Sequence, residues 1–471
     1  MKKYINSYAA FLVLLTTLNA CKVSQDIEAP QDAIPENFRD VAYEDSTGIA
    51  DLGWKEFITD ASLQQLIDSA LTQNYDLLMA QKNIEQAQWQ LNQAKWANVP
   101  DLNLQVTGTS NRPSDNSLNG LSTSTFLGKK HIEDYNAAIG LSWEADIWGK
   151  IRSRKQAALA EYLQSEEAKK GLQTTLVANV AKGYYNLLML DAQLAIAQKN
   201  LSLNDSTLFV INLQYEAGQV TSLAQQQAEA QQAVAAQLIP QLEQNIVIQE
   251  NALSIITGSF PDKKERSTTL NATDLHKDLK AGIPASLVSR RPDVKNAELA
   301  LKASNASVGI AKASMYPALN ITASAGLNSF ESSNWFNMPA SLFGIVAGSL
   351  TQPLLQKRKL KSAYEIAKIE REKTVINFRK TVLVAVGEVS DALVKIEKLN
   401  EQQTVASKRV AILQKAVKNA EMLFKNGMAT YLEVIIAQGN LLQTELERAA
   451  LKRAQLESEM ELYRALGGGW N

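Results

Sequence analysis

The side chains that most often perform chemistry are scarce in this chain. Among 471 residues there are one cysteine, Cys21, and two histidines, His131 and His276. A histidine-based catalytic site or a transition-metal cage needs several such side chains close together. The sequence holds no phosphate-binding glycine loop and no plausible pair of nucleophile and base. We therefore expect no enzyme, no cofactor and no metal site, and both histidines should be ordinary surface residues.

Cys21 is the one residue placed for a covalent modification. Two lysines precede a short apolar run, which is typical of a secretion signal and too short to span a membrane. The run ends in Leu18-Asn19-Ala20-Cys21, where small residues before a lone cysteine resemble a bacterial lipobox, although Asn19 is unusual there. The sequence predicts a signal peptide over 1–20 and lipidation of Cys21. The alternative is a signal peptide followed by an incidental cysteine.

Charge and composition exclude several classes of protein. The chain has 48 Lys and Arg against 49 Asp and Glu, so it lacks the basic footprint of a nucleic-acid binder. An apolar content of 45% excludes a wholly disordered chain. No window of 18 or more apolar residues is present, which argues against a helical membrane protein. The length exceeds one compact core and favours two domains or an elongated repeat.

The sequence contains an internal repeat. Helix patterns stop at Pro100 and at Pro317, which are 217 positions apart, and the turn glycines Gly218 and Gly427 are 209 positions apart. Each half shows the order helix, two strands, long helix, turn, helix. The first half has the longer loop between its strands.

The strand candidates alternate between apolar and polar residues. In the first candidate Leu102, Leu104 and Val106 face one way, and the residues between them face the other way. The same alternation occurs in three further candidates, at 135–144, 319–325 and 342–350, and is least clear in the last. Ten residues span about 33 Å, enough to cross an apolar band of about 25 Å. Long polar loops at 111–134 and 331–341 favour a membrane-spanning sheet. Two soluble hairpins on a core remain the alternative.

Two long helices carry matching heptad seams. Apolar residues follow a 4-3-4-3 spacing that is in phase between the halves. The seam residues are Leu190, Leu194, Ala197, Leu201, Asn204, Leu208, Ile211 and Tyr215, and Leu399, Gln403, Ala406, Val410, Leu413, Val417, Ala420 and Phe424. The pattern over 357–424 predicts a helix of about 100 Å. These helices should form a coiled-coil body.

Glycines and threonines mark the ends of these helices. Gly218 and Gly427 suit the left-handed residue after a helix, and Thr221 and Thr430 suit the first position of the returning helices. Thr430 with Glu433 fits a capping box. Both helical hairpins should therefore point their tips to the same end.

Four strands per chain require partners in a membrane. A closed transmembrane barrel needs at least eight strands, and open strand edges in lipid leave backbone groups unpaired. Two copies give eight strands and three give twelve. The arithmetic allows either number of copies.

Several segments match one family. The chain resembles the TolC-type outer-membrane efflux channels, in particular the OprM-like (NodT-type) lipoproteins that serve resistance-nodulation-division (RND) pumps. The matching segments are Gly53-Trp54-Lys55-Glu56-Phe57, residues 63–67, Trp143-Glu144-Ala145-Asp146-Ile147-Trp148-Gly149-Lys150-Ile151-Arg152, residues 283–294 with Arg290-Arg291-Pro292-Asp293, and Ala465-Leu466-Gly467-Gly468-Gly469-Trp470. They cover about residues 50–471.

The resemblance implies an α+β membrane channel. It would be a homotrimer with a twelve-stranded β-barrel, four strands per chain, continuous with a twelve-helix coiled-coil α-barrel. It would sit in the bacterial outer membrane, contact lipid and extend into the periplasm. A periplasmic membrane-fusion adaptor and an inner-membrane RND pump would be its partners. The duct would be passive and carry drugs or other small amphiphiles.

The resemblance also implies a domain plan. The plan has a signal peptide at 1–20, a tether and belt start at 21–60, a first repeat at 61–257 with a β-hairpin at 101–147, an equatorial insertion at 258–290, a second repeat at 291–466 with a β-hairpin at 318–354, and a C-terminal equatorial segment at 467–471.

The chain departs from the family at the periplasmic gate. Relatives carry Tyr, Asp and Arg at positions that map onto Phe424, Ala429, Glu433, Ile436 and Gly439. The expectation is an entrance narrowed by Glu433 carboxylates and an Ile436 ring; the alternative makes Glu433 only the capping partner of Thr430. The family assigns adaptor contact to the tips, here Gly218, Gln219, Thr221, Ser222, Gly427, Met428 and Thr430.

Two other functions stay open. One is a periplasmic coiled-coil scaffold lipoprotein that conducts nothing. The other, within the channel class, is a duct for type I secretion or metal efflux. Eight scattered methionines and two histidines do not favour metal.

Overall fold

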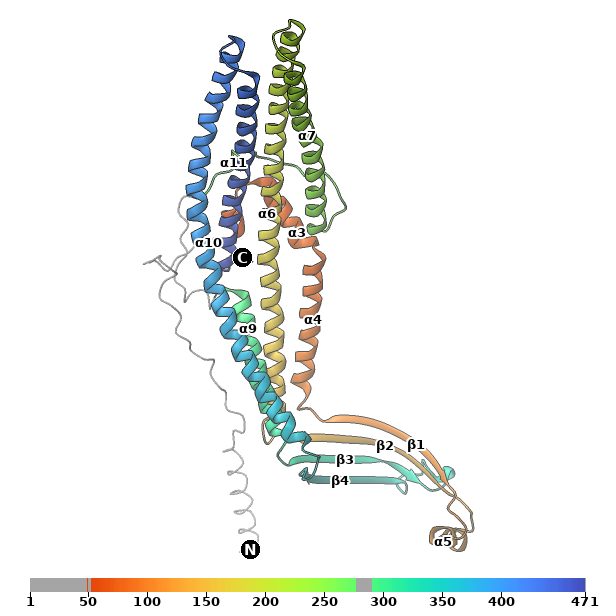
Figure 1. Ribbon diagram of the computed structural model, residues 1–471. Helices are drawn as coiled ribbons and strands as arrows, with labels where there is room; N and C mark the ends of the chain where they lie inside the picture. Colours follow the sequence, from red (N-terminus) through yellow and green to blue (C-terminus); the bar gives the residue numbers. More distant parts are fainter. Residues whose placement is uncertain (1–48, 50–51, 277–289, 471) are drawn as a thin grey trace. The chain divides into compact units, whose positions relative to one another are not determined.

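The computed structural model describes residue 49 and residues 52–276 and 290–470 (Figure 1). Over these residues the elements are α2 (Trp54–Phe57), α3 (Ala61–Gln73), α4 (Tyr75–Trp96), β1 (Asp101–Asn111), α5 (Leu118–Leu127), β2 (Ile132–Ala145), α6 (Lys150–Glu216), α7 (Ser222–Ile256), α9 (Pro292–Ala313), β3 (Ala318–Ser329), the short 3-10 helix η2 (Ser332–Asn334), β4 (Leu342–Thr351), α10 (Lys359–Lys425) and α11 (Tyr431–Ala465). Cys21 lies outside the described residues.

The predicted repeat is confirmed element by element. Helices α4 and α9 have 22 residues each, α6 and α10 have 67 each, and α7 and α11 have 35 each. Strands β1 and β3 begin 217 positions apart, as the two prolines before them are. Each half therefore contains a helix, a β-hairpin and a helical hairpin in the same order.

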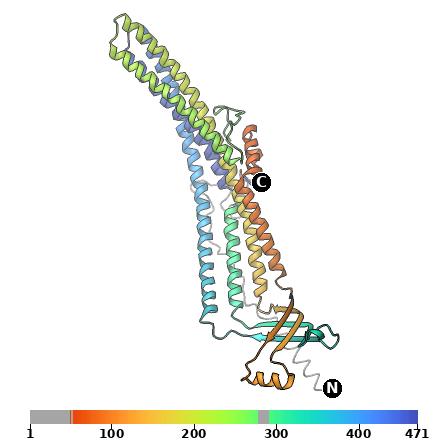
Figure 2. The same cartoon turned by 90° about the vertical axis from the view of Figure 1, so that its right-hand side faces the viewer.

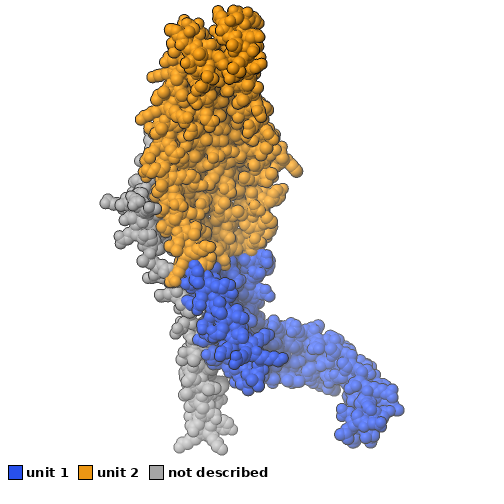
Figure 3. Space-filling model, viewed as in Figure 1, with its two compact units in different colours: residues 1–30, 86–163, 299–376 blue, residues 31–85, 164–298, 377–471 orange. Residues whose placement is uncertain are grey.

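The chain divides into two compact units (Figure 3). Among the described residues, unit 1 comprises 86–163 and 299–376, and unit 2 comprises the remainder. The β-hairpins of both repeats lie in unit 1 together with the first turns of α6 and α10, and the rest of both helical hairpins lies in unit 2. Within the described residues, no helix is both long enough and apolar enough to cross a membrane.

Unit 1 contains one antiparallel sheet in the order β1-β2-β3-β4. The β1–β2 connection contains a helix, α5, that the sequence analysis had taken as a polar loop. Ser117 caps it by accepting the N–H of Gly120 at 3.1 Å, and Gly128 ends it with φ +64°. Its small residue Gly120 faces inward, whereas Leu118 and Phe126 are each 85% exposed. A helix whose apolar side chains point outward gives no core-facing signal in the sequence.

Unit 2 is held by a core that joins both helical hairpins to α2 and α3. Tyr184, Leu187 and Leu253 are fully buried in it, together with Leu63 and Ile67 of α3. The N-terminal cap of α3 is Asp60, whose carboxylate accepts the N–H of Leu63 at 2.8 Å. The same carboxylate accepts the hydroxyls of Ser267 and Tyr184, so the cap also links α3 to α6.

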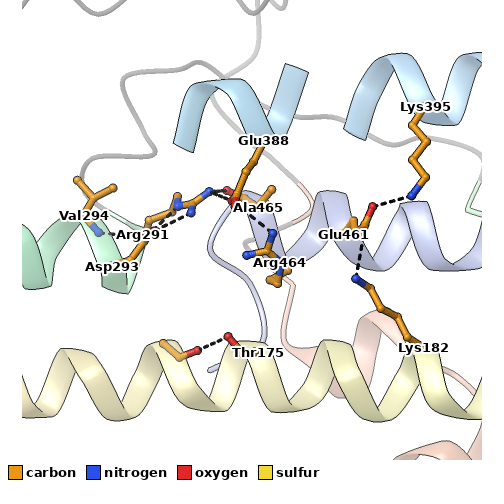
Figure 4. Close-up of polar contacts among 11 residues, drawn as sticks. Thr175, Lys182, Arg291, Asp293, Val294, Glu388, Lys395, Glu461, Arg464 and Ala465 are labelled. Carbon is orange, nitrogen blue, oxygen red and sulfur yellow. Dashed lines mark hydrogen bonds and ion pairs between the residues drawn. The ribbon is translucent and has the colours of Figure 1, made fainter. Parts of the chain in front are cut away.

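A buried arginine joins three helices of unit 2 (Figure 4). Arg291, 4% exposed, donates to both carboxylate oxygens of Asp293 at 2.9 and 2.7 Å. It also donates to Glu388 on α10 and to the carbonyl of Ala465 on α11. Burial raises the pKa of Asp293, but the guanidinium outweighs it and the net shift is downward. One buried side chain thereby links α9, α10 and α11.

The heptad seams lie inside the helical hairpins, as predicted. Ile211 and Val410 are 0% and 2% exposed, and most other seam positions are buried or half-buried. Tyr215 differs: it stands at the last seam position of α6 and is 43% exposed. Gly218 and Gly427 end the long helices with φ of +73° and +71°, which side chains other than glycine adopt only with strain.

The C-terminal glycines fit around a stack of three rings. The Phe57 ring lies between the rings of His276 and Tyr463, with both centroid distances 4.3 Å. A Cβ on Gly468 would come within 2.4 Å of the Tyr463 ring, so no larger residue fits there. His276 is at the surface, as expected, and it bonds to Glu459 on α11 (3.0 Å) and to the Phe57 carbonyl (3.0 Å). Its ring also packs in this stack, a contact that the sequence did not predict.

The His276 contact predicts a pH-dependent stability. Its hydrogen bond with Glu459 raises the pKa of His276, against the opposing effect of burial. A histidine whose pKa is higher in the folded than in the unfolded protein stabilises the fold at pH values below the unfolded pKa of about 6.5. This stabilisation is lost as the pH rises through the folded pKa. We expect His276→Gln to lower the thermal midpoint more at pH 5.5 than at pH 9. The exposed His131→Gln variant is the control, and equal losses at both pH values would contradict the assignment.

Candidate membrane-spanning sheet and channel entrance

One face of the sheet is a continuous apolar surface. In the antiparallel register Leu104 is paired with Ile139 and Ile139 with Ala325, so these side chains share a face. The face also carries Leu102, Val106, Ala137, Leu141, Trp143, Leu319, Ile321, Ala323, Leu327, Leu342, Val346 and Leu350. Leu104 is 74% exposed and Val346 81%. Large apolar side chains so exposed across a whole sheet face indicate contact with lipid.

The opposite face is small and polar. Asn103 is level with Gly140 and Ser324, and Asp101 is level with Ser142 and Thr322. This face suits water. The alternation predicted for the first three strands is therefore confirmed, and the register continues it into β4 despite the glycines there.

Two large side chains break the polar pattern of this second face. Phe343 is level with Gly326, and Ile345 with Ser324. Ile345 is 59% exposed, and Phe343 is half-buried, although the cross-strand neighbours of both are small. The sequence alone does not reveal this pair, because only the strand register shows which face the two side chains share.

Aromatic residues gather where β2 ends and β3 begins. Trp143 donates its indole N–H to the carbonyl of Asn98 at 3.0 Å. Trp148 donates to the carbonyl of Pro317 at 2.7 Å and stacks on Tyr316 with a centroid distance of 4.8 Å. Tryptophan and tyrosine at the end of an apolar face are typical of the membrane–water boundary.

Both outer strands of the sheet have an open edge. Within the chain, β1 pairs only with β2, and β4 only with β3. An edge in lipid would leave backbone N–H and C=O groups without partners, at several kcal/mol each. The sheet is therefore incomplete as a membrane structure until other copies pair with β1 and β4.

The tips of both helical hairpins lie at the same end of unit 2 (Figures 1 and 2). Ile211, Ala224, Phe424 and Val434, one from each of the four helices, form a shared cluster there. The tip residues of the predicted adaptor contact, Gly218, Gln219, Thr221, Ser222, Gly427, Met428 and Thr430, are exposed or nearly so. Thr221 occupies the capping position, but its side chain makes no capping bond.

The predicted gate residues differ in their surroundings. Phe424 is 7% exposed and belongs to the core of the tips. Glu433 is exposed, and its carboxylate accepts the backbone N–H and the hydroxyl of Thr430, so the capping pair is present. Ile436 is 53% exposed, and Gly439 faces Gln231 of α7. Glu433 and Ile436 thus remain available at the surface of one chain.

Known proteins resemble this chain over nearly its whole length. The model of the family "Outer membrane efflux protein" matches residues 66–259 and 283–468. The chain belongs to this family.

Relatives and solved structures agree with the assignment. The chain is 29% identical to the cation efflux system protein CusC of Escherichia coli O6:H1, over 96% of each protein. It is also 29% identical to the antibiotic efflux pump outer membrane protein ArpC of Pseudomonas putida, over 98% of this chain and 96% of that one. The open-state MtrE outer membrane channel of Neisseria gonorrhoeae superposes with a TM-score of 0.85 at 26% identity, covering 96% and 99%.

Family membership establishes location and role. The chain is an outer-membrane efflux channel, the outer-membrane component of a tripartite pump that includes a periplasmic adaptor and an RND transporter. It assembles as a homotrimer that pools four strands per chain into a twelve-stranded barrel, which completes both sheet edges. The predicted fold class, partners and location are thereby confirmed, and the scaffold alternative is set aside. Family members are channels and not enzymes.

The two sheet faces make a matched pair of substitutions possible. Leu104 and Asn103 are neighbours in β1 and lie on opposite faces. An arginine at the bilayer midplane of a barrel costs about 2–4 kcal/mol, whereas a lumen-facing arginine meets water. We expect Leu104→Arg to deplete trimers from the outer-membrane fraction and Asn103→Arg to leave them at the wild-type amount, measured by semi-native electrophoresis. Equal depletion by both variants would contradict the assignment of faces.

Proposed function

We propose that this channel is a passive exit duct for small amphiphiles such as drugs. The observation that supports this cargo is the pair Phe343 and Ile345 on the polar face of the sheet. In a trimer with that face toward the lumen, three copies of each side chain would offer apolar contact inside a wet pore. A molecule with both apolar and polar parts could interact with both.

The relatives do not decide the cargo, because one bears a name for cation efflux and another for antibiotic efflux. Within the described residues, no group of three or more His, Cys, Asp or Glu side chains is placed to hold a metal ion. The positive argument for amphiphiles therefore comes from Phe343 and Ile345. Export energy would come from the inner-membrane pump, and the channel itself would perform no catalysis.

The proposed periplasmic entrance is built from Glu433 and Ile436. Glu433 is held by Thr430 through two hydrogen bonds, so its carboxylate has a fixed position at the start of α11. Ile436 follows one turn later and is exposed. Three copies would place a carboxylate ring beside an apolar ring. The tip residues Gly218, Gln219, Gly427 and Met428 would then contact the adaptor, and a lipid on Cys21 would add an anchor.

The cargo proposal predicts selective block of the open channel. In planar bilayers, we expect tetraphenylphosphonium to interrupt the current of the wild-type trimer. Replacing Phe343 and Ile345 by serine should shorten the blocked periods about fivefold, because about 1 kcal/mol of apolar contact is lost. Ser324→Ala, on the same face, is the control variant. Tetramethylammonium, which has the same charge as tetraphenylphosphonium, is the control ion, and its effect on the current should be the same in all variants. Unchanged block in the double variant would contradict the proposal.

The entrance proposal predicts that charge and capping can be separated. Glu433→Gln keeps an oxygen that can accept the Thr430 N–H but removes the charge, whereas Glu433→Ala removes both. We expect the glutamine variant to lower cation selectivity, because three carboxylates are neutralised, and Ile436→Ala to raise conductance. If the Glu433→Gln channel behaves as wild type and only the Glu433→Ala channel is altered, Glu433 serves as a helix cap alone.

A further inference from the structure

Two basic stretches stand at equivalent places in the repeats of unit 1. The first basic stretch follows β2 and contains Lys150, Arg152, Arg154 and Lys155; the second follows β4 and contains Lys357, Arg358, Lys359 and Lys361. Lys150 and Lys359 are the first residues of α6 and α10. The duplication therefore places four positive charges at the start of each long helix.

These charges are not used inside the described part of the chain. Lys150 pairs with Glu144 at 2.9 Å, and Asp146 accepts the backbone N–H groups of Ile151 and Arg152. Among the described residues, no ion pair involves the other seven basic side chains, and all seven are exposed. Neither helix has an acidic residue in its first turn.

Basic residues at these positions carry an electrostatic and a conformational cost. The amino end of a helix is positive, so lysine and arginine there are disfavoured. Lys357 and Arg358 also adopt φ of +49° and +63°, a region in which glycine or asparagine is the usual choice. Basic side chains that carry such costs, and that have no ion pair among the described residues, point to an anionic partner outside the chain.

Both stretches begin at the same end of the sheet. Trp148, just before the first stretch, contacts Tyr316 and Pro317, which precede β3. Gln352, just before the second, donates to the carbonyl of Met315 in the same segment at 3.1 Å. The two basic stretches therefore converge on one rim of the sheet, opposite the rim that carries α5.

The side chains at this rim are of the kinds found at a bilayer surface. Leu350 is on the apolar face and 69% exposed, followed by Leu354 and Leu355, which are 85% and 97% exposed. The aromatic group of Trp148 and Tyr316 lies at the same rim, and the basic residues come directly after the exposed leucines in the chain. Exposed apolar, aromatic and positive side chains gathered at one rim suit the boundary between acyl chains and phosphates.

We propose that the two basic stretches bind anionic phospholipid of the periplasmic leaflet. Leu354 and Leu355 contact the acyl chains, and the lysines and arginines bind the headgroup phosphate; arginine does so through its planar fork. Charge complementarity selects a lipid with net negative charge, such as phosphatidylglycerol, over zwitterionic phosphatidylethanolamine. The site would hold the rim of the sheet at the level of the headgroups.

The test measures lipid retained by the purified trimer. Detergent-solubilised trimer is incubated with micelles holding equal amounts of phosphatidylglycerol and phosphatidylethanolamine, and the lipid that co-purifies is counted by native mass spectrometry. We expect wild type to retain phosphatidylglycerol preferentially. Lys357→Ser with Arg358→Ser, and Arg152→Ser with Arg154→Ser, should each lower retention at least threefold. Lys129→Ser with Lys130→Ser, an equal charge change in the loop after α5, should leave it unchanged.

Three further outcomes keep the proposal falsifiable. The swap Lys357→Arg with Arg358→Lys keeps the charges and should keep the lipid. Leu354→Ser with Leu355→Ser should lower lipid retention, because acyl-chain contacts are lost. Unchanged retention in this variant, or displacement of the lipid by inorganic phosphate, would mean that the site binds phosphate alone. Loss of the trimer in the serine variants would show that a neighbouring copy covers these residues, and would overturn the proposal, as would equal retention in all variants.

Discussion

The backbone at the two edges of the sheet determines how this protein must exist. In water, the free N–H and C=O groups of β1 and β4 would be satisfied by solvent; in hydrocarbon they have no partner within the chain. An apolar face as exposed as that of Leu104 and Val346 belongs in hydrocarbon. Both conditions are met only when copies join edge to edge. Association of several copies is thus a consequence of strand number, and the family sets the number at three.

The duplication gives each protomer two versions of one design, and their differences are informative. Helix lengths are identical between the halves, so the coiled-coil body tolerates little change in length. The strand connections differ: the first contains α5, and the second contains only a 3-10 turn. A connection exposed to solvent is not constrained by packing, whereas a helix that must match its neighbours residue by residue along a seam is.

The sequence predicted most of the elements because their signals are local and periodic. The alternation through Leu102 and Leu104 and the heptads through Val410 depend on spacing alone. Where the result depends on contacts between distant segments, the prediction failed or was silent. Tyr215 keeps the heptad spacing but stands beyond the packed part of α6, so it is exposed. The contacts of His276 with Phe57 and Glu459 were not predicted, because nothing nearby in sequence reveals either partner. Phe343 needed the register of β3 with β4 before its face was known.

Glu433 illustrates why a structural role and a functional role can share one side chain. A free glutamate at a pore would lose side-chain entropy each time it was held in a conducting or blocking position. The capping pair with Thr430 already holds this carboxylate at the start of α11. An entrance built on such a residue would need no separate device to orient its charge. In the proposed entrance the cap would supply a positioned carboxylate, and Ile436 would supply an exposed apolar side chain one turn away.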